Sequence, residues 1–540
     1  MKKITLAAAL LILSVLTAAA RKADATFSGV KDSYTLNADG AVTHRVQKTV
    51  TFNTNPSFFS LFGETFIVYN PAFQKLKIND SYTVQADGTR IDAPANAFNE
   101  VLPSGAANSA DFNGLREMVV THTGLEKGAT AFLDYTIESS SDGAPTLDID
   151  KIIPVQGAEF TDYTLEVTVP SGTPVNWSVA GSAVKPSVKG DTYTWTFRNI
   201  APASGEANTP LNHDGQARVS VTTASSLAAA LTPFTVETLD LCEAPEGVVS
   251  DTMDVKAKID AVRDYVAEGI ALARVEPSLL GYHLRQCADV VGSAIGTEAE
   301  KALAMARMLR AEGIDAQAVV VMPSGVEAKS PAAISRWLVK AGERYLTPLS
   351  TSDYEPALRA DRDECFTLGG ERIDIAPVRL ALNVNAVIDL AADSAKIVSR
   401  DIALKGSDKA ATLKGGDNVE HRGGYTVYTF PAGDAGVDSW GIGNFTGDRA
   451  EAIELPCAID ETDTYTVNLK GVTSAVRPYR KSVANAAGKV DISIVPEGDK
   501  IAVSRSISLA GSVYPAADYK LVCELLQAWQ APSGRRVVVK

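Results

Sequence analysis

The chain has 540 residues, with 51 basic and 65 acidic side chains that give a formal net charge of −14 at pH 7. This length exceeds what one hydrophobic core can hold, so several domains are expected. The acidic balance, without any long basic run, excludes a typical nucleic-acid-binding surface, because phosphate contacts need clustered Lys and Arg.

The first residues have the order of a secretory signal peptide. Two lysines precede an apolar run over residues 4–16, and small residues follow it. Cleavage sites of the small-residue type occur after Ala20 and after Ala25, and we favour the second, which assigns 1–25 to the signal. The alternative is an N-terminal anchor, for which the apolar run is short. No cysteine precedes Cys242 to carry a lipid anchor, so we expect a periplasmic or secreted protein without a transmembrane segment.

Residues 26–232 show the two-residue period of half-buried strands. Alternating apolar residues recur along several runs, for example around Val46, and Asp-Gly turn signals separate the runs. This pattern predicts an antiparallel β-sandwich. A polar stretch with Gly and Pro over 202–216 predicts a long loop. Three phenylalanines within 57–63 predict a strand edge or an inter-domain contact, with ligand binding as the alternative.

Residues 233–380 have the pattern of an α+β domain. A first helix is predicted from an apolar stripe that begins at Val255 and ends at Val266, with Asp251 as its cap. A second helix is predicted from a capping box and a closing glycine, which are Thr297, Glu300 and Gly313.

Three strands are predicted after the second helix. The first is an apolar run over 316–322, and two more cover 334–340 and 343–349. The Ala-Gly pair between the last two predicts a two-residue hairpin turn.

The period returns to two beyond residue 381. Alternating apolar residues near Tyr465 and Val490 mark two of the strands, and a helix follows with Trp529 on its apolar face. Residues 381–540 are therefore predicted to form a second β-sandwich with one helix. The whole chain is then a β-rich, multidomain α+β protein.

The order of signal, β-domain, helix-rich centre and β-tail resembles that of bacterial envelope proteins in which a domain of unknown function, number 3857, precedes a transglutaminase-like core. In the first domain the resemblance consists of short motifs in a shared order. They are Tyr34-x-Leu36 with Asp39-Gly40, Val68-Tyr69-Asn70-Pro71, Asp87-Gly88, and Leu125 to Gly128 before Tyr135. The resemblance implies a central domain with the papain-like fold of transglutaminase-like cysteine enzymes.

Glu298 occupies the position of the nucleophile in this resemblance. Such cores carry Gly-Tyr, then Gly-x-Cys at the start of a helix that ends in Leu-Arg-Ala-x-Gly-Ile. Here Gly281-Tyr282, Gly296 and the helix end at 309–314 keep that frame, and the residue two after Gly296 is Glu298. A helix N-terminus favours negative charge, so a carboxylate keeps the charge of a thiolate without its nucleophilicity.

Ser335 and Thr347 stand where the family places its histidine and its aspartate. A turn at Ala341-Gly342 would set Arg336 opposite Thr347, so the strands that once aligned a base with its orienting group are expected to persist. Neither hydroxyl titrates near neutrality, so neither can act as a base toward a thiol or water. Glu298, Ser335 and Thr347 are predicted to meet in one pocket that is catalytically silent.

The histidine positions support the loss of catalysis. None lies between 284 and 420, where the family's catalytic histidine belongs, so a shifted register cannot restore a triad. We therefore expect a non-catalytic binding or scaffolding module of the bacterial envelope, whose partner is a peptide, a glycan or another exported protein. The alternative is a transglutaminase-like peptidase or acyltransferase with an unconventional active site, such as a hydrolase centred on Glu298.

The other reactive residues are interpreted as structural. Cys287 lies at helical spacing from His283, but no cap or orienting residue accompanies the pair. Acids at 361–364 would raise the pKa of the Cys365 thiol, and they lack the length and glycine of a calcium loop. No metal site and no cofactor are predicted.

Five cysteines in an oxidising compartment leave at least one unpaired if all bonds are internal. At most two disulfides are expected. Cys457 and Cys523 are the favoured pair because both belong to the last domain.

Overall fold

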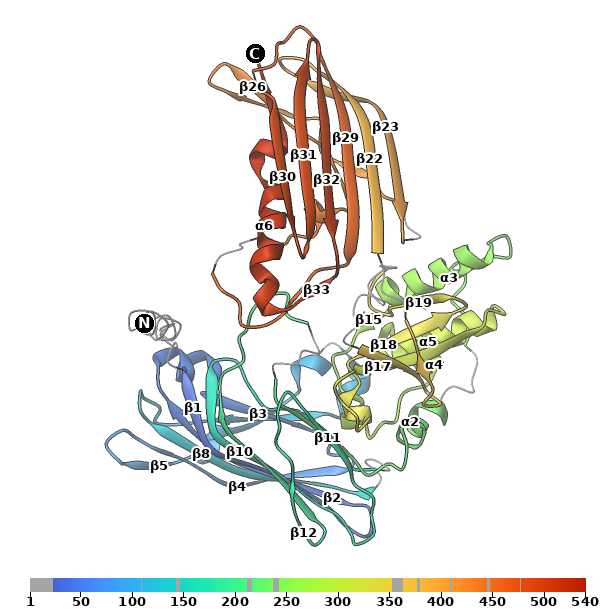
Figure 1. Ribbon diagram of the computed structural model, residues 1–540. Coiled ribbons are helices and arrows are strands. Elements are labelled where there is room, and N and C mark those ends of the chain that lie inside the picture. The colour runs from blue at the N-terminus through green and yellow to red at the C-terminus, as the bar shows by residue number, and fades with distance from the viewer. Residues whose placement is uncertain are drawn as a thin grey trace, which may run out of the picture.

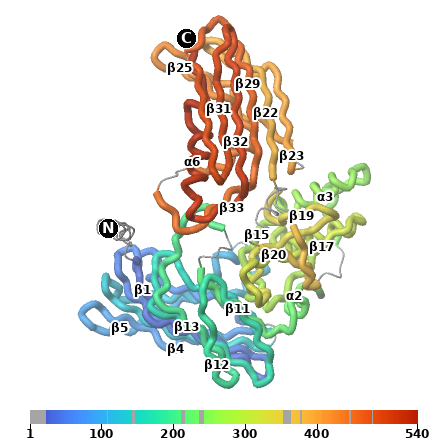
Figure 2. Tube along the Cα trace, in the orientation of Figure 1, coloured from blue at the N-terminus to red at the C-terminus, as the bar shows by residue number. Residues whose placement is uncertain are grey.

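The computed structural model describes residues 23–107, 109–141, 146–210, 216–236, 242–351, 363–375, 379–407, 410–443, 447–475 and 477–540. These residues form an N-terminal β-domain, a central α+β domain and a C-terminal β-domain (Figure 1). The C-terminal domain extends away from the other two, which lie side by side (Figure 2). The predicted signal peptide lies outside the described residues as far as position 22. Within the described part, no helix is both long and apolar enough to cross a bilayer.

The N-terminal domain is built on a large mixed sheet that buries one face. Its strands, in spatial order, are β12 (Ser187–Lys189), β13 (Thr192–Ile200), β10 (Ala158–Thr168), β1 (Ala25–Leu36), β2 (Val42–Phe52), β8 (Thr130–Ser139), β4 (Gln74–Val84) and β5 (Arg90–Asp92). Strands β1 and β10 run parallel, and the other pairs are antiparallel. Alternation along these strands directs apolar side chains to a single face, which must be covered.

Two small sheets cover that face. They are β11 (Asn176–Ala180), β14 (Arg218–Thr222) and β9 (Asp148–Ile152), and then β3 (Glu64–Tyr69), β7 (Arg116–Thr121) and β6 (Phe98–Val101). Buried residues of the large sheet share one core with Ile149 and Val219, and a second core with Ile67 and Val120. The β-rich character predicted for this domain is confirmed, but its large sheet is mixed and not antiparallel throughout, because β1 and β10 pair in parallel.

The central domain packs helices against a five-stranded sheet. The strands, in order, are β19 (Arg344–Leu346), β18 (Arg336–Ala341), β17 (Ala316–Pro323), β20 (Asp363–Thr367) and β21 (Arg372–Ile373). The helices are α2 (Leu227–Val236), α3 (Val255–Asp264), α4 (Cys287–Ser293) and α5 (Glu298–Ala311), with a short pair of strands, β15 (Ala271–Leu272) and β16 (Ile295–Gly296). Leu231 and Phe234 of α2 belong to this core, so the predicted domain boundary at 232 falls inside a helix of the central domain.

Helix α5 is the centre of this domain. Eleven of its 14 residues are buried. Its start has the predicted capping box: the Thr297 hydroxyl accepts from the Glu300 N–H at 3.2 Å, and the Glu300 carboxylate accepts from the Thr297 N–H at 2.8 Å. After its end, Gly313 has φ 74°, a conformation that glycine adopts without steric cost.

The first predicted helix has a different cap from the one we expected. Asp254, not Asp251, precedes α3, and its side chain accepts from the Ala257 N–H at 2.7 Å. Capping requires the residue immediately before the first helical turn, which is Asp254 for a helix that begins at Val255. Val255 itself is 62% exposed, so the buried stripe starts one turn later.

The register of the β18–β19 hairpin also differs from the prediction. Ala341 pairs with Arg344, so the two-residue turn is Gly342-Glu343 and not Ala341-Gly342. Gly342 has φ 58°, which a two-residue hairpin turn requires at its first position. The strand ends at Leu346, and Thr347 is not opposite Arg336.

The C-terminal domain is a six-stranded sheet covered by one helix among the described residues. Its strands, in order, are β23 (Ala395–Lys405), β22 (Arg379–Leu390), β29 (Ala458–Leu469), β32 (Lys500–Leu509), β31 (Gly488–Glu497) and β30 (Tyr479–Asn485). Helix α6 (Tyr519–Gln530) lies along β30 and β31 (Figure 1). The remaining strands are β25 (Val419–Arg422), β26 (Tyr425–Thr429) and β34 (Arg536–Val539), with two pairs, β24 (Leu413–Lys414) and β27 (Ala432–Gly433), and β28 (Ile453–Glu454) and β33 (Val513–Tyr514).

The described part of the predicted loop 202–216 docks the C-terminal domain onto the first. The Glu206 carboxylate accepts from the backbone N–H groups of Ala450 and Glu451, at 2.9 and 3.0 Å. The Asn208 carbonyl accepts from the Glu454 N–H at 2.7 Å. The loop is therefore an inter-domain contact, and its residues 211–215 lie outside the described part of the chain.

Buried charges lie inside the C-terminal domain, between its sheet and α6. Arg505 is 1% exposed; its guanidinium binds Asp463 at 3.0 Å and lies 3.9 Å from the centre of the Trp529 ring. Glu461 is also buried, and burial together with the nearby Asp463 charge raises the pKa of its carboxyl to about 8. Burial raises the pKa of Asp463 to about 6.

We expect the stability of the C-terminal domain to fall as the pH rises from about 5 to 8. The ordinary pKa of a glutamate carboxyl is 4.5, and that of Glu461 is about 8 in the folded domain. Over this pH window the Glu461 carboxyl is therefore ionised in the unfolded state and still protonated in the folded state. One such proton lowers the free energy of unfolding by at most about 1.4 kcal/mol per pH unit. Glu461→Gln removes the titration, and calorimetry at several pH values should show a flatter dependence.

Glu497→Gln is the matched control for this prediction, because Glu497 lies exposed on β31 of the same domain. It should reproduce the pH dependence of the natural protein. An unchanged slope in Glu461→Gln would contradict the assignment.

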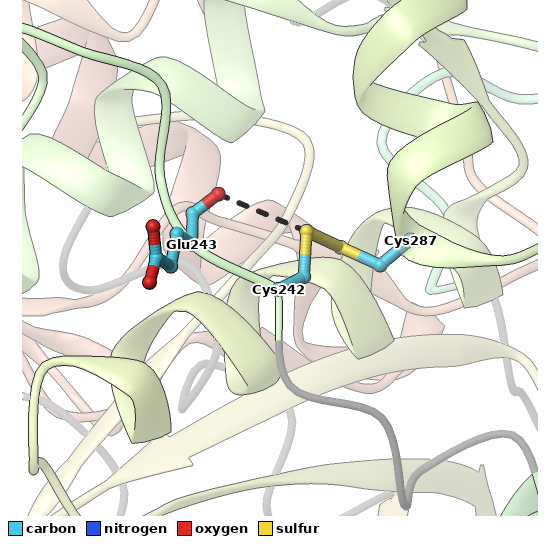
Figure 3. Close-up of a disulfide and its surroundings, with 3 residues drawn as sticks. All are labelled: Cys242, Glu243 and Cys287. Carbon is cyan, nitrogen blue, oxygen red and sulfur yellow. Dashed lines mark hydrogen bonds between the residues drawn. A yellow bond between two sulfur atoms is a disulfide. The ribbon is translucent and has the colours of Figure 1, made fainter.

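The disulfide pairing differs from the prediction. Cys242 and Cys287 form a disulfide, with Cα atoms 6.0 Å apart (Figure 3), whereas Cys457 and Cys523 are free and buried. Two cysteines pair only when their Cα atoms come within about 7 Å, and sharing a domain does not ensure this. The bond joins the segment before α3 to the first residue of α4.

We expect mass mapping of non-reduced peptides to find the Cys242–Cys287 link and three free thiols. The bond closes a loop with a sequence separation of 45, and such bonds contribute about 2–4 kcal/mol to stability. The double variant Cys242→Ser/Cys287→Ser should therefore unfold its central domain at lower urea concentration. A Cys457–Cys523 peptide in the map would contradict the structure.

Candidate functional site

Glu298 starts helix α5 and points to the neighbouring strand. Its Oε1 accepts a hydrogen bond from the backbone N–H of Trp337 on β18, at 2.8 Å. As the first residue of the helix it also lies in the favourable field of the exposed N–H groups. The carboxylate therefore joins the helix start to the strand as a structural contact.

Ser335 lies just before β18, two residues from Trp337. Its hydroxyl donates to the Val321 carbonyl at 3.1 Å, and its own N–H donates to the same oxygen at 2.8 Å. Thr347 is buried beyond the end of β19, and its hydroxyl accepts from the Leu349 N–H at 3.2 Å. The structure brings Glu298 to the strand that follows Ser335, and the meeting of all three residues in one pocket stays a prediction.

The described histidines lie outside the β18–β19 hairpin and the residues that flank it. His44 bonds Asp32 in the N-terminal sheet, and in the same domain burial lowers the pKa of His122 to about 4. His421 is on β25 in the C-terminal domain, and His213 lies outside the described residues.

The thiols and acids interpreted as structural have partners or are buried. Cys287 is in the disulfide, so it is not a free thiol beside His283. Burial raises the pKa of the Cys365 thiol to about 12. Asp363 binds Arg336 at 3.0 Å, and Asp361 lies outside the described residues. Across the described ranges no group of His, Cys, Asp and Glu side chains is placed to hold a metal ion.

The three phenylalanines near residue 60 lie on a turn of π-helix over Ser57–Leu61 and just after it. Phe58 packs against Phe52 of β2, and Phe62 packs against Phe27 of β1. Phe59 is 80% exposed. Two of the three rings therefore pack against the two central strands of the large sheet and do not lie at the strand edge that we had predicted, and the third faces solvent.

A cleft lies between the N-terminal and central domains, beside the strand that carries Trp337. We call this cavity of about 560 Å³ the interdomain cleft. Its size is in the range of small-molecule and peptide sites. Strands β1 and β9 form one wall, and the segments before α4 and β18 form the other. The residues that characterise it are Tyr34, Asp148, Lys151, Glu276, Tyr282 and Trp337.

The two walls of the cleft are held together by direct hydrogen bonds. The Ser330 hydroxyl donates to Asp148 of β9 at 3.0 Å. Nearby, the Ala328 N–H donates to the Ser178 hydroxyl at 3.2 Å. The segment that leads to Ser335 is thus anchored on the N-terminal domain, which closes one end of the cleft.

Tyr282 has an unusual backbone for a residue with a side chain. Its φ is 60°, and the preceding Gly281 has the same value. The left-handed conformation costs free energy for a non-glycine residue, and such residues concentrate at functional sites. The side chain is 5% exposed, its ring contacts Phe234 at 5.8 Å between ring centres, and it lines the cleft.

Tyr282 belongs to a motif that is visible in the sequence, whereas Asp148 and Glu276 were not predicted to be at a site. Asp148 lies on a strand of the first domain, far in sequence from the central motifs. Only the domain packing brings it to the cleft, and nothing in the local pattern of β9 sets it apart.

The comparisons with known proteins match this architecture. Residues 38–204 match the family described as a domain of unknown function with a solved structure, DUF3857, and residues 425–539 match DUF3858, described in the same way. No curated protein matches the sequence. Neither matched range includes the central domain.

Among solved structures, a protein from Parabacteroides distasonis ATCC 8503, proposed to be a protease, is similar over 96% of this chain and 99% of its own, with 31% identity and a TM-score of 0.81. A carbohydrate-binding CBM3a-L domain of Clostridium thermocellum scaffoldin is 16% identical over 22% of this chain and 69% of its own, with a TM-score of 0.15. An M1 zinc metallopeptidase from Deinococcus radiodurans is 12% identical over 54% and 72%, with a TM-score of 0.19. Scores this low do not support a shared fold for the last two.

Proposed function

The chain belongs to the same family as the Parabacteroides distasonis protein. Within this family, we propose that it is an exported, non-catalytic binding module of the bacterial envelope. In this proposal the central domain is a transglutaminase-like frame that has lost its triad. The interdomain cleft is the binding site, and a peptide, a glycan or an exported protein is the partner.

The state of Glu298 is the observation that carries this proposal. A transglutaminase-like enzyme needs a thiolate at this helix start and a titratable base on the next strand. Here the carboxylate is bonded to the Trp337 N–H, and the Ser335 hydroxyl is bonded to a carbonyl. Both groups are engaged in backbone contacts, and neither can perform acyl transfer.

The Cys242–Cys287 bond supports export. Disulfides persist in oxidising compartments such as the periplasm and are rare in the cytosol. Together with the basic and apolar order of the first residues, this favours a cleaved signal peptide.

A second candidate function is a peptidase, because the Parabacteroides distasonis protein is proposed to be a protease. Lys301 is the amine nearest in sequence to Glu298 on α5, and burial lowers its pKa to about 8. Its Nζ donates to the Ile270 carbonyl at 2.6 Å, and Lys301 as a whole is only 2% exposed. This engagement favours a structural role for Lys301 and leaves the binding module as the first proposal.

We expect the purified protein to lack both peptide hydrolysis and amine incorporation into glutamine peptides, and Glu298→Ala to give the same result. The reason is the missing nucleophile and base. A microbial transglutaminase and a general protease should be run as positive controls for the two assays. Activity above background that disappears in Glu298→Ala would overturn the non-catalytic proposal.

We expect the mature protein to begin at Arg21, after cleavage at Ala20. We now favour this alternative over Ala25 because Ala25 is fully buried in β1 and pairs with Phe52, and the Ala23 carbonyl accepts from the Asn53 side chain at 3.1 Å. Cleavage after Ala25 would remove these contacts from the beginning of β1. N-terminal sequencing of the exported protein checks the site, and a start at Thr26 would show that these contacts are dispensable.

A further inference from the structure

The charges that line the interdomain cleft are not balanced. Among the residues that line the cleft, Lys151 is the one lysine or arginine. The Lys151 Nζ lies 3.3 Å from the carboxylate of Asp32, a residue that does not line the cleft. Asp150 is held by Arg218, whose guanidinium nitrogens lie 2.7 to 3.0 Å from its two oxygens. Two cleft carboxylates, Asp148 and Glu276, have no cationic partner among the described residues.

Among the described residues, the side-chain donors to Asp148 are hydroxyl groups. Ser330 donates to one oxygen at 3.0 Å, and Thr146 donates to the other. Hydroxyl donors do not neutralise a carboxylate, and burial raises the pKa of this group. A cation placed beside it would remove that penalty.

Tyr282 is a second, independent sign of a ligand. Its side chain is 5% exposed and lines the cleft, yet its hydroxyl has no hydrogen-bond partner among the described residues. The charges of Asp148 and Glu276 act on this hydroxyl and add to the effect of burial in raising its pKa. The Tyr282 ring is buried, but its hydroxyl oxygen is not sealed from solvent, so a ligand atom in the cleft can reach it and form the hydrogen bond that it lacks.

The remaining walls are apolar and aromatic. Pro277, Pro331 and Ile334 line the cleft together with the rings of Tyr34 and Trp337. Such walls fit an aliphatic stem, and aromatic faces attract a cation. Apolar walls with carboxylates and a hydroxyl match a side chain that has methylene groups and ends in a primary ammonium.

We propose that the interdomain cleft binds the primary ammonium group of a lysine-like side chain in a peptide, with Asp148 and Glu276 offsetting its charge and the Tyr282 hydroxyl as a further contact. This inference rests on the proposed binding function and names the chemistry of its ligand. Diamino acids in envelope peptides and lysines of exported proteins present the same group.

The test compares two blocked peptides, acetyl-Ala-Lys-Ala-amide and the same peptide with an acetylated lysine side chain. Binding to the full-length mature protein is measured by calorimetry and by line broadening of the peptide NMR signals. We expect the lysine peptide to bind at least about ten-fold more tightly, because acetylation removes the charge-assisted contacts to the two carboxylates.

Variants then assign the preference to the cleft. Glu276 is exposed, so Glu276→Gln should fold normally and should reduce the preference for the lysine peptide several-fold. Tyr282→Phe should reduce lysine-peptide affinity without changing the binding of the acetylated peptide. Glu497→Gln, an exposed acid-to-amide change in the C-terminal domain, is the matched control and should leave both affinities unchanged.

The outcomes separate this inference from the proposed function. Equal binding of the two peptides, or a preference that survives in Glu276→Gln, overturns the ammonium site but leaves a binding module. Failure of both peptides to bind, while purified envelope glycan strands or peptidoglycan fragments without free amines do bind, also overturns the ammonium site alone. Failure of every probe, with or without amines, overturns both.

Discussion

The ion pair between Arg285 and Glu300 holds the start of helix α5, and the rest of the central domain depends on it. The guanidinium bonds both carboxylate oxygens, at 3.0 and 2.8 Å, while the carboxylate also accepts from the Thr297 N–H. The Glu300 side chain is fully buried. Removing one partner from such a pair leaves a buried charge and costs several kcal/mol, typically about 3–5.

The same guanidinium reaches the N-terminal domain. It forms an ion pair with Asp111, and it lies 4.6 Å from the centre of the Phe112 ring. The helix start and the domain interface are thus fixed by one side chain. The capping box, Arg285 and the packing of α5 therefore hold the helix start in place without any contribution from the side chain at position 298.

Charge pairing separates the structural carboxylates from those of the cleft. Asp32, Asp150 and Glu300 each have a basic partner within 3.3 Å. Asp148 and Glu276 line the cleft, and neither has a basic partner in the part of the chain that the structure describes. A largely buried carboxylate with only neutral donors is costly, so the contrast between Asp148 and the paired acids supports a ligand in the cleft.

Local sequence patterns determined the elements of this protein and part of their order. The capping box at Thr297 and Glu300, the helix end at Gly313 and the two-residue period of the β-domains were predictable, because caps, left-handed turns and alternation act within a few residues. The place of Glu298 at the start of a helix was also predictable, because the capping box at Thr297 and Glu300 marks where that helix begins.

Tertiary structure alone decided which distant groups meet. The Cys242–Cys287 bond, the contact of Ser330 with Asp148 and the cleft around Tyr282 join segments whose own patterns do not refer to one another. The one-residue shift of the β18–β19 turn shows the same limit at short range, since a single glycine conformation moved the register. The spacing of residues along the chain determines the local geometry of helices, strands and turns. Contacts between residues of different domains depend on how the apolar faces and charged groups of those domains are buried against each other.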